Sequence, residues 1–204
     1  MTLLIGITGN IGSGKSAFCR ILEQHGERVI YADEVAQKQL DKPEILQKLS
    51  ERWGKDFISD GRADRQKIAS IVFGNPDELA FLNSVVHPKT LQEFQGIVEE
   101  CQAEHLFFEV PLLFEADLAA CFDHLVIITA TREIRLQRLL KRDSQSRQQI
   151  ETRMDAQMDD SLKIPLCDLV VENNGSWEDL SQAAQKLISD LPNIKPKEKR
   201  AFYP

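Results

Sequence analysis

The hydrophobic residues of this chain fall into short continuous runs that alternate with helical patterns. The runs have strand length and cover residues 3–7, 28–32, 105–110, 124–129 and 169–172. Such runs are typical of strands in a parallel sheet that is covered on both faces. Strands that alternate with helices predict an α/β fold, a three-layer α/β/α arrangement around a doubly wound parallel sheet, with ligands at the carboxyl ends of the strands.

Helical periodicity fills most of the chain between these runs. Apolar residues recur at helical spacing over residues 16–25, before Gly26 supplies a stop. Similar patterns cover residues 132–142, 147–158 and 176–191. Ser146 and Gln149 form a capping-box pattern, and Ser176 is expected to cap the last helix.

Residues 34–103 form a helical block that contains no strand of comparable strength. The apolar spacing predicts helices over residues 44–53, 65–73 and 76–86. We expect His87-Pro88 to end the third helix and to begin another, because proline lacks a backbone donor and restricts the residue before it. The pattern therefore predicts a helical insertion within the α/β domain.

The most informative motif lies between the first strand and the first helix. Residues 9–16 read G-N-I-G-S-G-K-S, a complete phosphate-binding loop of the form G-x-x-x-x-G-K-[ST]. Its glycines permit a backbone whose N–H groups point at an anion, and the following helix directs its positive end to the same place. Lys15 is expected to reach the β- and γ-phosphates, and the Ser16 hydroxyl to bind a magnesium ion. The motif predicts ATP or GTP binding.

Asp33 follows the second predicted strand, on the same rim of the sheet as the phosphate-binding loop. A carboxylate in that place can orient an acceptor hydroxyl and accept its proton during phosphoryl transfer. The alternative is that Asp33 is only the N-cap of a helix starting at Glu34. The rim position favours the catalytic interpretation.

Three arginines, Arg135, Arg138 and Arg142, share one face of the helix over residues 132–142. Arg147 and Arg153 follow, which gives this acidic chain one local concentration of positive charge. In nucleotide kinases such a segment, here residues 132–160, closes over the nucleotide as a lid and stabilises charge on the transferred phosphoryl group. The alternative is a solvated helix face whose charge is balanced by Glu133, Asp143 and Glu151.

Two further residues carry weaker signals. His87 precedes a proline after an apolar helix and suits either a structural role or a substrate contact. Glu109 ends an apolar strand, where a carboxylate can help to hold a metal through water.

Composition and charge exclude several classes of function. The chain has 204 residues, 42% of them hydrophobic, and a formal net charge of −7, which suits one domain and gives no basic footprint for nucleic acid. The four cysteines form no C-x-x-C pair, so we expect reduced thiols in a cytoplasmic protein. No apolar run reaches the ~20 residues of a membrane span, and no signal peptide is expected. The charged residues 195–200 predict a solvated tail.

Several segments together resemble dephospho-CoA kinase. The resemblance rests on residues 7–16, Ala32-Asp33, the L-N-x-x-x-H-P segment at 82–88, V-P-L-L-F-E at 110–115, Gln137-Arg138 through Arg142-Asp143, Arg153 with Gln157, and Asn173-Asn174-Gly175. The phosphate-binding loop is shared by many enzymes, whereas the segments at 82–88 and 110–115 are specific. The resemblance covers nearly the whole chain.

This resemblance implies a P-loop kinase that phosphorylates the ribose 3′-hydroxyl of dephospho-CoA with ATP and Mg²⁺, as a monomer or weak homo-oligomer. It implies a core of residues 1–33 and 104–192, an acceptor-binding insertion at 34–103 and a tail from 193. The ATP-binding residues would be Gly12, Ser13, Gly14, Lys15, Ser16, Ala17, Arg142 and Asn174, and the acceptor would be bound by Asp33, His87 and Arg138. Catalysis would fall to Lys15, Asp33 and Arg142.

Three positions depart from the frequent pattern of the family. Tyr31 stands where the family often has an aspartate, Gln37 replaces a frequent arginine, and Ala17 replaces a frequent threonine. A nucleoside monophosphate kinase is the nearest alternative, because it shares the fold and the ATP site, but the segment at 82–88 argues against it. A nucleotide-dependent switch would need a guanine motif such as N-K-x-D, which the sequence lacks.

Overall fold

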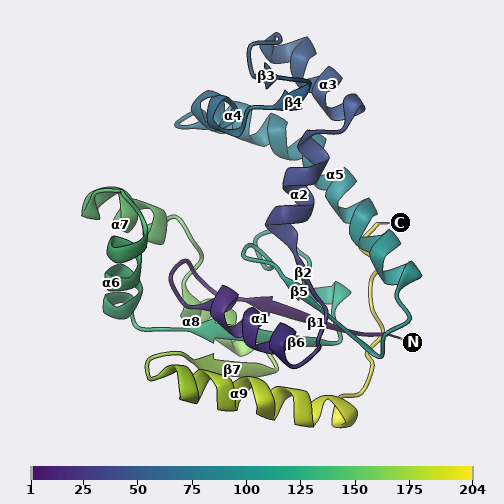
Figure 1. Ribbon diagram of the computed structural model, residues 1–204, viewed down its shortest axis with the longest axis vertical. Helices are drawn as coiled ribbons and strands as arrows, with labels where there is room; N and C mark the ends of the chain where they lie inside the picture. The colour runs from purple at the N-terminus through teal and green to yellow at the C-terminus, as the bar shows by residue number, and fades with distance from the viewer. Residues whose placement is uncertain (1, 204) are drawn as a thin grey trace. The chain divides into compact units, whose positions relative to one another are not determined.

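The computed structural model describes residues 2–203, which form two compact units (Figure 1). The first unit runs to Tyr31 and resumes over Cys101–Arg200. The second unit contains Ala32–Glu100 and the residues after Arg200. The chain therefore enters the second unit directly after the second strand, and its last residues return to that unit.

The first unit is built on a five-stranded sheet in the order β2-β5-β1-β6-β7. Every neighbouring pair is parallel, as the continuous apolar runs predict. The central strand β1 is buried along its whole length, so its carboxyl end delivers the phosphate-binding loop to a rigid edge. The strands are β1 (Leu3–Thr8), β2 (Val29–Tyr31), β5 (His105–Glu109), β6 (His124–Thr129) and β7 (Leu169–Glu172).

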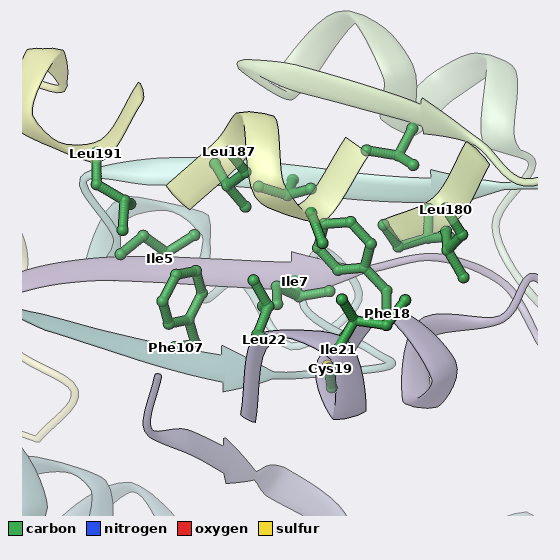
Figure 2. Packing of buried hydrophobic residues seen from close by; sticks show 14 of the residues in the cluster. Ile5, Ile7, Phe18, Cys19, Ile21, Leu22, Phe107, Leu180, Leu187 and Leu191 are labelled. Atoms are coloured by element: carbon green, nitrogen blue, oxygen red, sulfur yellow. The ribbon is translucent and has the colours of Figure 1, made fainter. Parts of the chain in front are cut away.

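Two helices, α1 (Lys15–Gln24) and α9 (Trp177–Asp190), pack against one face of this sheet. Figure 2 shows Phe18 and Leu22 of α1 beside Ile7 of β1, with Leu187 of α9 in the same hydrophobic cluster. All four side chains are at most 2% exposed, and each such burial contributes about 1.5–3 kcal/mol. This apolar layer fixes the start of α1 against the strand that precedes it.

The lid region comprises α6 (Arg132–Arg142), α7 (Arg147–Asp155) and α8 (Asp160–Lys163). The predicted capping box is confirmed, since the Ser146 hydroxyl accepts from Gln149 N and the Gln149 side chain accepts from Ser146 N. Helix α7 ends at Asp155, before the expected Met158, because Asp159 caps a separate helix by accepting from Ser161 N.

The second unit contains four helices and a two-stranded hairpin within the described residues. Its core is formed by Ile45, Leu49, Phe57, Ile68, Val85 and Val86. The helices are α2 (Ala32–Leu40), α3 (Pro43–Trp53), α4 (Arg65–Val72) and α5 (Pro76–Glu100), and the hairpin strands are β3 (Ile58–Ser59) and β4 (Arg62–Ala63). Among residues 2–203, no helix is both long enough and apolar enough to cross a membrane.

The expected helix break at His87-Pro88 is wrong, because α5 continues through Pro88. A proline inside a helix costs about 3 kcal/mol, but Val85, Val86, Thr90 and Phe94 are buried on both sides of it. Pro88 and His87 themselves are exposed, so the carbonyl that loses its partner lies near solvent. Packing of the buried face therefore overrides the local preference.

Most of residues 195–200 are exposed, as the prediction of a solvated tail requires, but hydrogen bonds fix the segment in place. Lys197 N and Lys199 Nζ donate to the two oxygens of Asp123, at 2.8 and 2.5 Å. Within the second unit, Phe202 is 5% exposed and stacks edge-on with Phe94, with 5.5 Å between the ring centroids. Periodicity could not reveal this, since the tail has no regular structure and its partners are distant in sequence.

We predict that Phe202→Ala lowers the thermal unfolding midpoint by several degrees, because deleting a buried phenylalanine costs roughly 3 kcal/mol or more. Tyr203→Ala is the matched control, because that side chain is 40% exposed. Scanning calorimetry measures both variants. Equal midpoints for the two would contradict the packing of the tail.

Candidate active site

The phosphate-binding loop has the backbone that its glycines predict. Gly9 and Gly14 have φ values of 142° and 100°, which residues with a side chain rarely adopt. A Cβ at Gly9 would overlap the Ile128 carbonyl oxygen, and one at Gly14 would overlap the Asn173 amide nitrogen. Gly14 is also the N-cap of α1, so the loop passes directly into the positive end of that helix.

Lys15 is the first residue of α1 and is 9% exposed. Its Nζ donates to Gly9 O at 2.7 Å and lies 3.8 Å from Glu109 Oε1. Glu109 ends β5, which is adjacent to β1. The lysine is therefore held beneath the loop, with its charge next to the place where the motif predicts phosphate.

A pocket of about 200 Å³ opens beside this lysine. The loop forms one wall and α6 forms the other. Its lining residues are Ile11, Gly12, Gly14, Lys15, Ser16, Arg138, Leu139 and Arg142. Six of these contribute a backbone N–H, a hydroxyl or a positive charge from the loop or from α6, which makes the pocket suitable for a polyanion.

Arg138 fastens α6 to the loop. Its guanidinium donates to Ser13 O at 3.2 Å and to Asn173 O at 2.9 Å, and a longer bond of 3.4 Å reaches Gly12 O. Arg138 therefore provides a hydrogen-bond donor to the carbonyls of Gly12 and Ser13, as polar backbone groups require. The role of Arg138 in acceptor binding stays a prediction. Its hydrogen bonds to the carbonyls of the loop were not predicted from the sequence.

The other arginines separate into distinct environments. Arg142 lines the pocket but is exposed, and it donates to Asp143 Oδ1 at 2.6 Å. These bonds hold the pKa of Asp143 below its usual range, with a further contribution from Arg153. Arg135 is 6% exposed and lies 3.3 Å from Asp160, whereas Arg147 pairs with Glu151 at the surface. Of the three arginines predicted to share one helix face, Arg138 and Arg142 line the pocket, whereas Arg135 is buried beside Asp160.

The two asparagines after β7 have different positions. Asn173 is buried, and its Nδ2 donates to Ser13 O at 2.8 Å. Asn174 is exposed, and its Oδ1 accepts from Thr131 N, at the turn that begins α6. The contact between Asn174 and ATP remains a prediction. Asn173 holds the loop through its bond to Ser13 O, which the loop motif alone did not reveal.

The thiol of Cys19 and the phenol of Tyr31 both have raised pKa values. Burial, aided by the nearby Glu109 carboxylate, raises the pKa of the Cys19 thiol far above its ordinary value. Burial also raises the pKa of Tyr31, and its hydrogen bond to Glu23 adds to the shift. Both groups stay protonated at neutral pH, so neither supplies a nucleophile or a base.

Asp33 and His87 belong to the second unit. Helix α2 begins at Ala32, so Asp33 is the second residue of its first turn, and the N-cap interpretation is wrong. Its side chain is exposed, as is that of His87 in the middle of α5. No cluster of three or more metal-ligating side chains occurs within residues 2–203.

Comparison with known proteins identifies relatives over nearly the whole chain. The sequence model of the family described as CoaE, dephospho-CoA kinase, matches residues 3–179. A dephospho-CoA kinase of Carboxydothermus hydrogenoformans is 37% identical over 180 residues, which cover 86% of this chain and 87% of that protein. One from Fusobacterium nucleatum is 31% identical, with coverages of 93% and 98%.

Solved structures agree with these matches. TT1252 from Thermus thermophilus has a TM-score of 0.82 and 33% identity, covering 93% of this chain and 98% of that one. Dephospho-CoA kinase from Campylobacter jejuni has a TM-score of 0.66 and 26% identity, with coverages of 93% and 97%. Shikimate kinase from Acinetobacter baumannii, at 14% identity and a TM-score of 0.55, shares the fold alone.

We predict that Arg138→Met raises the dissociation constant for ADP about tenfold or more. Hydrogen bonds from a charged donor contribute about 1.5–3 kcal/mol, and ~1.4 kcal/mol corresponds to tenfold in affinity. Arg138→Lys keeps the charge but loses the planar fork, so it should not restore affinity. Arg147→Met, on the exposed side of α7, is the control. Titration calorimetry would refute this role if Arg138→Met bound ADP as the parent does.

Proposed function

This chain belongs to the dephospho-CoA kinase family, and we propose roles for its residues in the reaction of that family. The enzyme transfers the γ-phosphoryl group of ATP to the ribose 3′-hydroxyl of dephospho-CoA, and the products are CoA and ADP. A nucleoside monophosphate kinase is not favoured, since both curated relatives described above are dephospho-CoA kinases. The observation that carries the residue roles is the pocket between the loop and α6.

We propose that the loop, Lys15 and Arg142 bind the phosphates of ATP. Gly12, Gly14, Lys15 and Ser16 already line the pocket, so little reorganisation would be needed when the nucleotide arrives. Lys15 would exchange its bond to Gly9 O for the β- and γ-phosphates. Arg142 would turn from Asp143 toward the transferred phosphoryl group, since it already lines the pocket. Asn174 would contact the base.

A divalent metal accompanies ATP in kinases of this kind, and we propose Mg²⁺. When bound, it neutralises charge that develops on the phosphates. The oxygen donors present suit it: the Ser16 hydroxyl is exposed at the start of α1, and the Glu109 carboxylate ends β5 beside Lys15. Ser16 would be a direct ligand, while Glu109, which is already paired with Lys15, would act through water.

We propose that Asp33 is the general base toward the acceptor. Strand β2 ends at the same edge of the sheet as β1, and Asp33 is the second residue after β2. Its carboxylate would orient the 3′-hydroxyl and accept its proton as the phosphoryl group is transferred. The helical unit, including His87, would bind parts of dephospho-CoA remote from the hydroxyl, with help from Arg138.

We further propose that the enzyme acts in the cytoplasm, as a monomer or weak homo-oligomer. The cysteines support the first point. All four are free thiols, as proteins of a reducing compartment require.

Asp33→Asn is expected to lower kcat about 100-fold or more, because it removes the base while keeping the side-chain shape. Glu34→Gln is a matched control, since Glu34 is the other exposed acid in the first turn of α2. Both substitutions weaken the same helix-dipole interaction, so their unfolding midpoints should agree. Steady-state kinetics that leave Asp33→Asn as active as Glu34→Gln would exclude a catalytic role.

The choice of acceptor is tested with a panel of substrates. We expect ATP-dependent phosphorylation of dephospho-CoA to exceed that of AMP, GMP, CMP or UMP by orders of magnitude, because remote contacts orient the larger substrate. His87→Ala should raise the KM for dephospho-CoA more than the KM for ATP. Gln92→Ala, exposed on the same helix, should change neither. If His87→Ala leaves the acceptor KM unchanged, His87 has a structural role only.

A further inference from the structure

Lys163, the last residue of α8, is a lysine whose side chain has no exposed surface. Its Nζ donates to Glu115 Oε1 at 2.8 Å and to Asn10 Oδ1 at 2.9 Å. Glu115 follows the Pro111-Leu112-Leu113-Phe114 segment, and Asn10 is the second residue of the phosphate-binding loop. One buried cation thus joins the loop to two segments that are far apart in the sequence.

The side chain of Asn10 is fixed at both ends by this arrangement. While Oδ1 accepts from Lys163, Nδ2 donates to Met158 O at 3.0 Å. The backbone carbonyl of Asn10 accepts from Ser13 N at 3.1 Å, which closes the turn of the loop. An asparagine held in this way leaves the turn that follows it little freedom to rotate.

The next residue is held by the same part of the chain. Ile11 N donates to Gln157 Oε1 at 2.7 Å. The Ile11 side chain packs against the core that α6 and α7 share, formed by Leu136, Leu139, Ile150 and Met154. Asn10 and Ile11 are therefore hydrogen-bonded to residues 157–163, and the Ile11 side chain also packs against the core of α6 and α7.

Burying a lysine has a large desolvation penalty, because the ammonium group is removed from water. A well-packed apolar side chain in place of a buried ion pair is often neutral or stabilising, whereas removing one partner alone is strongly destabilising. What the ammonium group supplies beyond packing is direction, because it selects which end of the Asn10 amide faces it.

We propose that Lys163 is a positioning residue for nucleotide binding, acting through Asn10 with Glu115 as its counterion. It does not touch the nucleotide. It holds Asn10, and hence the turn that ends at Ser13, so that the following N–H groups remain directed at the phosphates. This inference rests on the proposed function of the loop in binding ATP.

The test compares Lys163→Met with the double variant Lys163→Met/Glu115→Leu. The single variant leaves a carboxylate without its counterion and should lower the unfolding midpoint. The double variant removes that carboxylate, so it should recover the midpoint. We expect both variants to bind ADP about tenfold more weakly and to raise the KM for ATP, with the KM for dephospho-CoA nearly unchanged. ADP affinity, the two KM values and the midpoint are measured on the full chain.

Lys199→Met is the matched control. Lys199 is also nearly buried, and its Nζ lies 2.5 Å from Asp123 Oδ2, away from the residues that line the nucleotide pocket. Its loss should lower the midpoint without changing ADP affinity. A second arm places Lys163→Met on an Asn10→Ala background, where it should weaken ADP binding no further, since the route through Asn10 is already broken.

Two results would overturn the proposal: parental ADP affinity in the stable double variant, or an undiminished effect of Lys163→Met when Asn10 is alanine. Either would reduce Lys163 to a structural ion pair. ADP titration does not depend on the acceptor, so it tests Lys163 even if the parent enzyme failed to phosphorylate dephospho-CoA. That separate failure would contradict the proposed function instead.

Discussion

The chemistry of this protein depends on how the backbone of a short glycine-rich loop is hydrogen-bonded. Each backbone carbonyl of the loop needs a hydrogen-bond donor. If side chains supply these donors, the carbonyls do not need the N–H groups of the loop, which remain available for phosphate. Arg138 and Asn173 supply those donors at Ser13, while Gln157 and Lys163 hold the two residues before Gly12. The loop has no regular structure of its own, so side chains from α6, α8 and the end of β7 determine its shape.

This dependence explains why the segments that resemble the family extend far beyond the loop. Residues near 138, 157 and 173 lie at sites that are distant in the sequence but adjacent in the first unit. Glu115, which ends the Val110–Glu115 segment, is linked to the loop through Lys163. A phosphate-binding loop can occur in many proteins, whereas this set of supports requires the whole first unit to be built in one way.

Local patterns in the sequence predicted the elements but not their long-range partners. The strands of the parallel sheet begin and end within one residue of the predicted runs, because continuous apolar runs report burial directly. Pro88 led to the wrong prediction of a helix break. The local cost of a proline inside α5 is smaller than the gain from the continuous buried face of that helix. In the sequence, Arg135 and Arg138 cannot be distinguished from exposed arginines, because residue type and helical spacing are the same for all of them. Only the tertiary partners Asp160 and Ser13 distinguish their roles.

Because the residues after Arg200 belong to the second unit, this unit is assembled from two segments that are far apart in the sequence. Ala32–Glu100 leave the ribosome before Phe202, which packs edge-on against Phe94, is made. Domains tend to fold as units as the chain emerges, from the N-terminus onward. The packing around Phe94 therefore cannot be completed until Phe202 has been synthesised, although the helices of this unit are available earlier.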